Sequence, residues 1–479
     1  MKNRLTVLLF ALFVTLLACM LSACNFFSLN ASMPETEAVP EDPASCFEYS
    51  ITNGEVAITK YIGSRTEVVI PSEIEGYPVT SISSSAFRGC DYLRSITIPA
   101  SVKSIGNYAF DDCDSLASVT FGENSKLTSI GEVAFLNCSS LTSIEIPASV
   151  TSIGSSAFHY CYKLVEVYNL SSLSVTKGST DHGYVGYYAL NVYTSLDTSS
   201  KQWTTDDGFI FYEDGDVCYL LGYTGDKTDL VLPADCNGKA YAIYQYAFCN
   251  CSGLTSITIP DGVTSIGSDA FEDCTSLASI TIPASVKSIG SDAFRDCTSL
   301  SDIKIPASVK SIGSDAFYGC SALSGITLPF VGATKDGTTN THFGYIFGAF
   351  SYRDNGSYIP NSLKTVVITD GTSIGECAFY DCDSLASITI PASVKSIGSD
   401  AFSGCDSLAS VTFGENSKLT SIGECAFYAC NSLTSITIPA NVTSICDYAF
   451  EDCTSLASVT FGENSKLESI GFVAFYNCS

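Results

Sequence analysis

Histidine, methionine and tryptophan are scarce in this chain of 479 residues, which contains three, three and one of them. Basic residues are also few, since 23 Lys and Arg stand against 50 Asp and Glu and leave a formal net charge of −27. Such an acidic chain repels phosphate groups, so we expect no nucleic-acid partner. The sequence has no phosphate-binding loop, Gly-x-Ser-x-Gly motif or dinucleotide fingerprint. We therefore expect neither enzymatic activity nor a cofactor.

Metal ligands in a usable pattern are missing as well. His159, His182 and His342 lie far apart in the sequence, and no cysteine pair with zinc spacing combines with a histidine. The acidic segments 111–114 and 213–216 lack the twelve-residue loop pattern of a calcium site, and we interpret them as solvated turns. We predict no metal site.

A long membrane-spanning run is also lacking, because the apolar segment 6–21 is short. It follows a basic start and ends in Leu21-Ser22-Ala23-Cys24, which is similar to a bacterial lipobox. This resemblance implies that residues 1–23 are a signal peptide and that Cys24 is acylated, whereas an ordinary signal peptide would make Cys24 incidental. Residues 24–45 are rich in proline and acidic residues, and we predict that they form a disordered tether. We expect an exported protein, lipid-anchored at the bacterial cell surface or outer membrane.

The chain is rich in one repeated phrase, Ala-Phe-x-x-Cys, which occurs thirteen times. Within a block, neighbouring cysteines of this phrase lie 23 or 25 residues apart. A fixed period of this length is typical of a solenoid, in which coils stack and no coil holds a core by itself. The repeat cysteines are Cys90, Cys113, Cys138, Cys161, Cys251, Cys274, Cys297, Cys320, Cys382, Cys405, Cys430, Cys453 and Cys478.

One repeat, residues 254–274, illustrates the expected coil. Residues 256–259 alternate polar and apolar side chains, which is the pattern of a half-buried strand. Pro260 ends this strand because it lacks a backbone donor. A second short extended piece follows, Gly267 permits a bend, and Ala270-Phe271 returns the chain as a turn or short helix. The pattern predicts a β-rich solenoid with one parallel strand ladder and short turns or helices on the other side.

These residues resemble the BspA-like leucine-rich repeats, with the pattern L-x-x-I-x-I-P-x-x-V-x-x-I-G-x-x-A-F-x-x-C. The match covers most of residues 82–161, 243–328 and 366–478. The resemblance implies a leucine-rich-repeat protein that is surface-exposed or secreted. It also implies a link to adhesion to host matrix proteins and other cells.

Twenty-two cysteines in an exported chain raise the question of a disulfide framework. The thirteen repeat cysteines occupy a coil position expected to face inward, where a free thiol packs as a small hydrophobe. We predict that these cysteines are free. Cys218 with Cys236, and also Cys377, Cys425 and Cys446, fall outside this row, and a bridge among them is an open alternative.

The repeats fall into three arrays. Asn53-Gly54 predicts a hairpin in a cap before the first array, and a related module recurs around Gly215, before the second. No polar cap follows the last repeat, so we expect a truncated sequence. The segments are 46–161 (cap and first array), 162–208 (first excursion), 209–328 (cap-like module and second array), 329–361 (second excursion) and 362–479 (third array).

The two excursions resemble each other and are rich in aromatic residues. The first contains His182-Gly183-Tyr184-Val185 and the second His342-Phe343-Gly344-Tyr345-Ile346, so Tyr184 and Tyr345 occupy matching positions. In one interpretation the rings fold onto the solenoid. In the other, some rings stay exposed as binding anchors. Under the second interpretation the candidate ligand-binding residues are Tyr184, Trp203, Tyr345 and Tyr352.

One residue of each strand is expected to face outward, and most of these residues are threonine. Uniform threonine favours a structural role, while a flat, uncharged face also suits glycans. Glu145, Glu166 and Lys304 are exceptions where specific recognition can enter, and we take Glu145 and Lys304 as candidate ligand contacts. The row is Thr97, Thr120, Glu145, Glu166, Thr258, Thr281, Lys304, Thr327, Val367, Thr389, Thr412, Thr437 and Thr460.

The sequence therefore predicts a cell-surface binding protein with an extracellular protein or glycan ligand, most plausibly an adhesin. The alternative is a passive structural spacer or coat protein without a high-affinity ligand. Exposed aromatic rings in the excursions favour the first, and buried rings favour the second.

Overall fold

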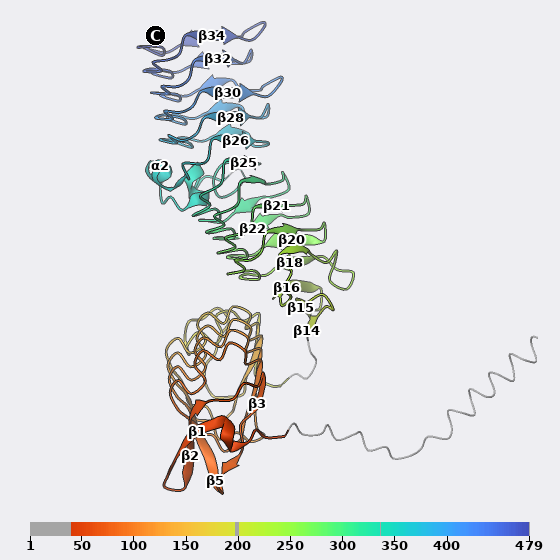
Figure 1. Ribbon diagram of the computed structural model, residues 1–479. Helices are drawn as coiled ribbons and strands as arrows, with labels where there is room; N and C mark the ends of the chain where they lie inside the picture. Colours follow the sequence, from red (N-terminus) through yellow and green to blue (C-terminus); the bar gives the residue numbers. More distant parts are fainter. Residues whose placement is uncertain (1–39, 197–200, 336, 479) are drawn as a thin grey trace, which may run out of the picture.

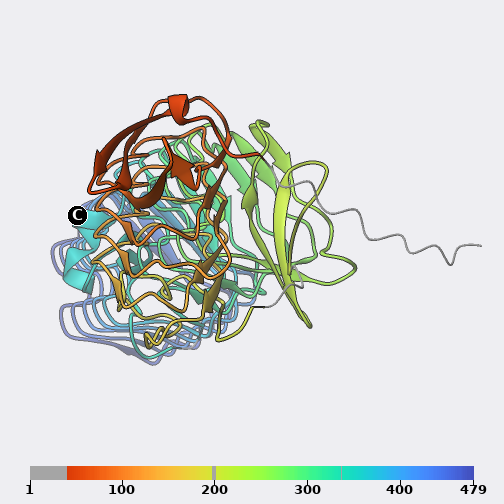
Figure 2. The same cartoon turned by 90° about the horizontal axis from the view of Figure 1, so that it is seen from below.

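The computed structural model describes residues 40–196, 201–335 and 337–478. Cys24 and the signal-peptide segment 1–23 lie outside the described residues. The described chain winds into stacked coils, which form a first solenoid, residues 40–196, and a second solenoid, residues 201–478 (Figure 1). Viewed from below, the coils of the second solenoid lie one behind another, whereas those of the first are seen from the side, from red at the top to yellow below (Figure 2). The β-rich solenoid predicted from the repeat is confirmed.

The first solenoid is built from short strands and one 3-10 helix, η1 (Ala44–Cys46). Its strands are β1 (Phe47–Thr52), β2 (Glu55–Tyr61), β3 (Glu67–Val69), β4 (Glu73–Ile74), β5 (Tyr77–Ile82), β6 (Ser95–Ile98), β7 (Ser104–Ile105), β8 (Ser118–Phe121), β9 (Ser129–Ile130), β10 (Ser143–Ile146), β11 (Ser152–Ile153), β12 (Glu166–Asn169) and β13 (Asn191–Tyr193).

The second solenoid includes the second and third arrays. Up to the second excursion its strands are β14 (Gln202–Thr204), β15 (Phe209–Asp214), β16 (Val217–Tyr223), β17 (Asp229–Val231), β18 (Tyr241–Ile243), β19 (Ser256–Thr258), β20 (Val263–Ile266), β21 (Ser279–Thr281), β22 (Ser288–Ile289), β23 (Asp302–Lys304), β24 (Ser311–Ile312) and β25 (Gly325–Leu328). The second excursion carries η2 (Phe343–Phe347), η3 (Tyr352–Asp354) and α2 (Asn355–Tyr358). The third array has β26 (Thr365–Ile368), β27 (Ser373–Ile374), β28 (Ser387–Ile390), β29 (Ser396–Ile397), β30 (Ser410–Phe413), β31 (Ser421–Ile422), β32 (Ser435–Ile438), β33 (Ser444–Ile445), β34 (Ser458–Phe461) and β35 (Ser469–Ile470). In the described residues no helix is long and apolar enough to cross a membrane.

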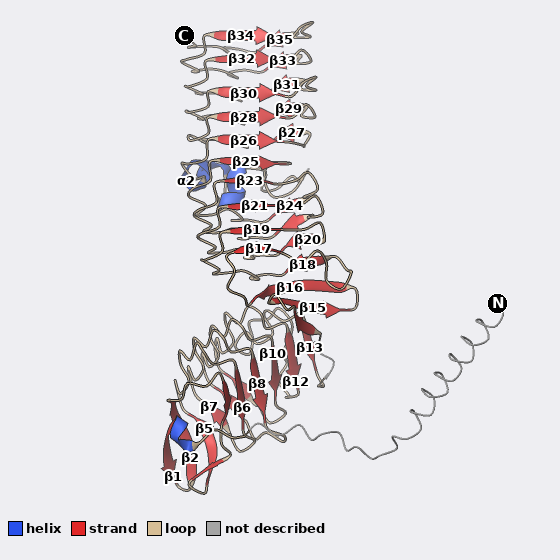
Figure 3. Cartoon of the chain, turned by 45° about the vertical axis from the view of Figure 1, so that its right-hand side comes forward, coloured by secondary structure: helices blue, strands red, loops and turns tan. Residues whose placement is uncertain are grey.

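Each coil contributes one strand to each of two parallel ladders (Figure 3). The major ladder contains the strands with the outward row, for example β6 and β8, where Thr97 pairs with Thr120. The minor ladder contains mostly two-residue Ser-Ile strands, for example β7 and β9, where Ile105 pairs with Ile130. The sequence predicted one ladder, because a two-residue strand is too short to recognise from alternation.

A column of phenylalanine rings fills the centre of the coils. In the second array, Phe271 and Phe294 stack with ring centroids 5.3 Å apart, and Phe294 and Phe317 with centroids 5.4 Å apart. Next to this column, most buried repeat cysteines donate a hydrogen bond to the coil before them, as when the Cys297 thiol donates to the Phe271 carbonyl over 3.2 Å. The repeat cysteines of the described chain are free, as predicted.

Residues in the left-handed region bend each coil. Asp269 and Asp273 have φ of 54° and 56°, a conformation that aspartate and asparagine tolerate better than most residues. Gly267, expected to make the bend, does not have a positive φ. A Cβ on Gly267 would instead lie 2.6 Å from the Gln245 amide nitrogen of the coil before it. Glycine is required there because two backbones approach closely, not because the chain turns.

Both predicted hairpins are present. β1 and β2 pair antiparallel around Asn53-Gly54, and β15 and β16 pair antiparallel around Gly215. In the second hairpin a disulfide joins Cys218 on β16 to Cys236, with the two Cα atoms 6.5 Å apart. This bond settles the pairing that the sequence left open for these two cysteines.

The first excursion lies where the two solenoids meet. Tyr162 of the first solenoid stacks on Tyr246 of the second, with ring centroids 4.1 Å apart. The Tyr244 hydroxyl donates to the Tyr188 carbonyl over 3.0 Å, and the Asn191 amide donates to the Tyr212 hydroxyl over 2.7 Å. The end of one solenoid therefore packs on the hairpin module of the next through tyrosine side chains.

The second and third arrays share one core. The major ladder passes directly from β25 to β26, where Thr327 pairs with Val367, while the minor ladder stops at β24 and restarts at β27. The second excursion fills this interval, because Phe347 and Phe343 continue the ring column from Phe317 to Phe379. The excursion thus replaces part of a coil.

Candidate functional site

The outward face of the major ladder is a regular row of β-branched side chains. Thr258 pairs with Thr281, and Thr389 pairs with Thr412, so the threonine hydroxyls line up along the solenoid. Between Thr437 and Thr460 the two hydroxyl oxygens are 2.9 Å apart and share a hydrogen bond. Such a face offers neutral hydrogen-bonding groups at a constant spacing.

The position expected for Glu166 was wrong. β12 pairs with β10 so that Tyr168, not Glu166, lies beside Glu145, and Tyr193 of β13 continues the row. Glu166 is only 4% exposed, and the Tyr168 hydroxyl donates to its carboxylate over 3.1 Å. Glu166 lies 21 residues after Glu145, two fewer than the 23 residues that separate Cys138 from Cys161, so the outward position was assigned two residues too early.

The major ladder is interrupted where the other two exceptions lie. No strand pairing joins β8 to β10 or β21 to β23, so Glu145 and Lys304 are on the first strands after two interruptions. Burial raises the pKa of Glu145 above its ordinary value. Lys304 lines an open hollow of about 450 Å³ together with Asp302, Thr327 and Val367. Of the two candidates, Lys304 therefore borders an opening in the strand face.

The structure places the four aromatic candidates against different residues of the two solenoids. Trp203 stacks on Phe211 with centroids 4.9 Å apart, and Tyr184 stacks on His159 with centroids 4.3 Å apart, so both pack within their own solenoid. Tyr345 packs against the core of the second solenoid. Tyr352 lies edge-on to Tyr380 with centroids 5.5 Å apart.

Tyr184 and Tyr345 do not occupy matching positions in the coils. The Phe158 amide donates to the Gly183 carbonyl, whereas the Phe317 amide donates to the Ile346 carbonyl. By this register Tyr184 corresponds to Phe347. Pairing the two tyrosines is therefore two residues out of the coil register, because Tyr345 precedes Phe347 by two residues.

Phe350 is a functional candidate that the sequence did not distinguish from the other aromatic residues of the second excursion. Its side chain is 88% exposed, although the neighbouring Ala349 is buried. The Phe350 ring lies 6.3 Å from Tyr358, which lies 6.4 Å from Tyr318, and the Arg295 guanidinium lies over the Tyr318 ring at 4.9 Å. We call Arg295, Tyr318, Phe350 and Tyr358 the aromatic patch. Arg295 and Tyr318 come close to the excursion only in the folded chain, so the sequence alone could not predict the aromatic patch.

One cluster in the described part of the chain has atoms of metal-binding type close together. A Glu213 carboxylate oxygen and the sulfurs of Cys218 and Cys236 lie within 4.8 Å of one another. The sulfurs are bonded to each other, and the Glu213 carboxylate accepts a hydrogen bond from Lys239 over 2.8 Å. The cluster is therefore a disulfide beside an ion pair.

The repeat geometry coincides with a known family. The family model described as "BspA type Leucine rich repeat region" matches in six copies, over residues 60–180, 237–335 and 357–479. The chain belongs to this BspA-type family. Its coils, with the Ala-Phe turn and the inward cysteine, are BspA-type leucine-rich repeats. No curated protein matches the chain.

Several solved leucine-rich-repeat structures are similar to the chain. A leucine-rich repeat protein from Bacteroides ovatus is 23% identical, with 92% of each chain covered and a TM-score of 0.37. A leucine rich cell surface protein from Faecalibacterium prausnitzii is 26% identical, with 90% of this chain and 99% of that chain covered and a TM-score of 0.25. A leucine-rich repeat protein from Bacteroides capillosus is 34% identical over 27% of this chain and 96% of that chain, with a TM-score of 0.24.

Proposed function

We propose that this chain is a cell-surface binding protein, an adhesin, and that its aromatic patch contacts a protein ligand. The exposed Phe350 ring carries this proposal. It is held on an excursion whose Phe343 and Phe347 are locked into the core, so the loop presents the ring from a packed base. Tyrosine, arginine and phenylalanine in one patch are the residue types enriched in the centres of protein interfaces. A passive spacer has no need of an exposed ring in this position.

A binding measurement separates adhesin from spacer. The full chain is tested against immobilised extracellular matrix proteins and whole cells, beside a Phe350→Ser variant and a Tyr77→Ser control. Tyr77 is also exposed but lies on β5, at the other end of the molecule. We expect Phe350→Ser to weaken binding about tenfold or more, with an unchanged Tm, because a central aromatic contact is worth roughly 2 kcal/mol. No binding by the full chain favours the spacer, whereas equal binding by both variants contradicts the role of the aromatic patch.

Glu145, Lys304, Tyr345 and Tyr352 are secondary candidates in this proposal. Lys304 lines a hollow in the strand face together with Asp302, and Glu145 is a charged exception in a row made mostly of threonine, so either can select a ligand by charge. Tyr345 and Tyr352 belong to the same excursion as Phe350. Trp203 and Tyr184 contact core or repeat residues, which supports a structural role for their rings.

We also propose that Cys24 anchors the protein to a membrane as an acylated N-terminus. The support is the lipobox-like Leu21-Ser22-Ala23-Cys24 after a short apolar run. Mass spectrometry of membrane-extracted protein from its natural host should show a lipid-modified peptide that begins at Cys24. An unmodified mature N-terminus in that preparation would contradict the anchor and leave the binding proposal intact.

A further inference from the structure

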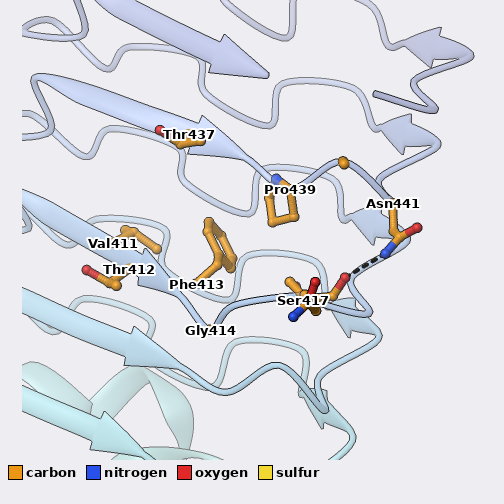
Figure 4. Close-up of a pocket in the computed structure, with 10 residues that line it drawn as sticks. Val411, Thr412, Phe413, Gly414, Ser417, Thr437, Pro439 and Asn441 are labelled. Atoms are coloured by element: carbon orange, nitrogen blue, oxygen red, sulfur yellow. Dashed lines mark hydrogen bonds between the residues drawn. The ribbon is translucent and has the colours of Figure 1, made fainter. Parts of the chain in front are cut away.

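The strand face opens into a hollow of about 530 Å³ between β30 and β32. Its lining residues are Val411, Thr412, Phe413, Gly414, Asn416, Ser417, Thr437, Pro439, Ala440 and Asn441. Figure 4 shows the Phe413 ring in the gap between the two coils, with Pro439 beside it and the Asn441 amide hydrogen-bonded to the Ser417 backbone. That bond, from Asn441 Nδ2 to the Ser417 carbonyl, is 2.8 Å long.

The hollow lies where the major ladder is interrupted. No backbone hydrogen bond joins β30 to β32, whereas β31 and β33 of the minor ladder remain paired. The coil that begins with β30 is a longer one, with Phe-Gly-Glu-Asn-Ser-Lys in place of the shorter turn. Its Lys418 amide donates to the Ala392 carbonyl of the coil before it, so the extra residues are fixed in place. Two coils thus separate on one side while they stay joined on the other.

The first solenoid contains the same coil in a closed form. Residues 113–132 and 405–424 are identical in sequence. In the first copy Val119 and Phe121 are 7% and 8% exposed, whereas the corresponding Val411 and Phe413 are only partly buried. The difference must therefore come from the neighbouring coils, and the following coil forms the other wall of the hollow.

Two substitutions in the following coil distinguish the copies at this face. Asn441 stands where the first copy has Ser149, whose hydroxyl donates to the Ser125 and Leu127 carbonyls over 2.8 and 2.7 Å. Thr437 stands where the first copy has Glu145. The open copy therefore has a neutral rim and a longer amide side chain at its edge.

The lining has a composition that fits one class of ligand. None of its residues is charged, although the whole chain has a net charge of −27. The Phe413 and Pro439 rings give flat apolar surfaces, and the Thr412 and Thr437 hydroxyls and the Asn416 amide give hydrogen-bond donors and acceptors beside them. A sugar ring has the same alternation, because it has apolar C–H faces and a rim of hydroxyls.

We propose that this hollow binds an uncharged sugar unit of a glycan. This deepens the proposed surface-binding function by naming a ligand class for a second site, separate from the aromatic patch. An acidic sugar is disfavoured because the hollow offers no cation to pair with it. An extended peptide is the other class of ligand, but pairing with the free edge of β30 would require a strand's width between β30 and β32, which remain in contact.

The test uses the full chain and an array of immobilised neutral, sialylated and sulfated oligosaccharides. We expect binding to neutral glycans and not to the acidic ones. Thr437→Glu and Asn441→Ser each introduce the residue that the first copy has at that position, so the fold accepts them, and each should lower glycan binding at least tenfold with an unchanged Tm. The matched control is Glu145→Thr with Ser149→Asn in the first solenoid, which should leave glycan binding by the third array intact.

Several outcomes overturn the sugar site. They are no binding to any neutral glycan, binding by the Thr437→Glu and Asn441→Ser variants that equals that of the unmodified chain, or competition by unstructured peptides and not by free sugars. The Phe350→Ser variant should retain glycan binding, and Thr437→Glu should retain binding to a protein ligand. Loss of one activity without the other therefore shows which of the two proposals has failed.

Discussion

Phe294 and Thr281 lie in the same part of the second solenoid but have opposite surroundings. The Phe294 ring is fully buried between Phe271 and Phe317, and the Thr281 side chain is on the exposed strand face. We predict that Phe294→Ala lowers the free energy of unfolding by about 3–5 kcal/mol, because it leaves a cavity in the column. Thr281→Ala should cost about 1 kcal/mol or less. Chemical denaturation of both variants checks this, and equal losses would contradict the assignment of faces.

Asp269 couples the stability of the second array to pH. Burial raises the pKa of its carboxyl group to about 7, and the nearby Glu272 and Asp292 carboxylates add to this, against the lowering effects of Tyr246 and Arg295. Since the folded-state pKa is above that of an unfolded aspartate, about 3.9, folding favours the protonated form. The stabilisation is complete below about pH 4 and is lost as the pH rises through about 7.

We predict that Asp269→Asn raises Tm at pH 8 relative to the unmodified chain and that this gain disappears near pH 4. Asparagine tolerates the left-handed conformation of this position and cannot ionise. The control is Asp273→Asn, at the second left-handed position of the same coil. Thermal melts between pH 4 and 8 give the answer, and parallel curves for Asp269→Asn and the unmodified chain would refute the coupling.

Within the coil, the cysteine is held by packing and by one hydrogen bond. The Cys113 thiol donates to the Phe87 carbonyl over 3.1 Å, and burial raises the pKa of Cys113 well above its ordinary value. A thiol that is buried and protonated is a poor nucleophile. The repeated coil therefore protects its cysteine from oxidation and alkylation.

We predict that an alkylating reagent at pH 8 leaves most repeat cysteines of the folded protein unmodified and modifies them after denaturation. Cys425 and Cys446, which are partly exposed and outside the row, serve as internal controls that should react first. Mass spectrometry of labelled peptides gives the count. Six or more disulfides in the intact protein would show that the free-thiol row is wrong.

The structure of a single coil could be predicted from the sequence, but its contacts with the neighbouring coils could not. The alternation of polar and apolar residues and the period of the repeat predicted the strand, the proline that ends it, and the inward cysteine and phenylalanine. These features depend on one coil alone. The outward position of Tyr168 agrees with the 23-residue spacing from Glu145, which the assignment of Glu166 did not follow. The role of Gly267 depended on the backbone of the preceding coil. The difference between the Val119 and Val411 surroundings had no local signal, since the two coils have the same sequence.

At the scale of the whole molecule, the two excursions explain why the chain is not one uniform rod. The first supplies Tyr188 and Asn191 to the contact between the solenoids. The second inserts Phe343 and Phe347 into a continuous core. The aromatic residues of these segments were predicted either to pack on the solenoid or to bind a ligand. Only the burial of their side chains distinguishes the two roles. Most of these rings pack, and Phe350 is the large exception.

The stacked ladders determine how the molecule carries a mechanical load. Strands run across the solenoid and hydrogen bonds run along it, so tension between an N-terminal anchor and a ligand on the third array pulls neighbouring coils apart. Each coil bonds mainly to its neighbours, so they should peel away singly at modest force, and each 23-residue coil releases about 80 Å of chain. The protein would then act as an extensible tether that limits the force on its bond. Single-molecule stretching should show a series of small steps, and one abrupt unfolding event for the whole second solenoid would contradict this.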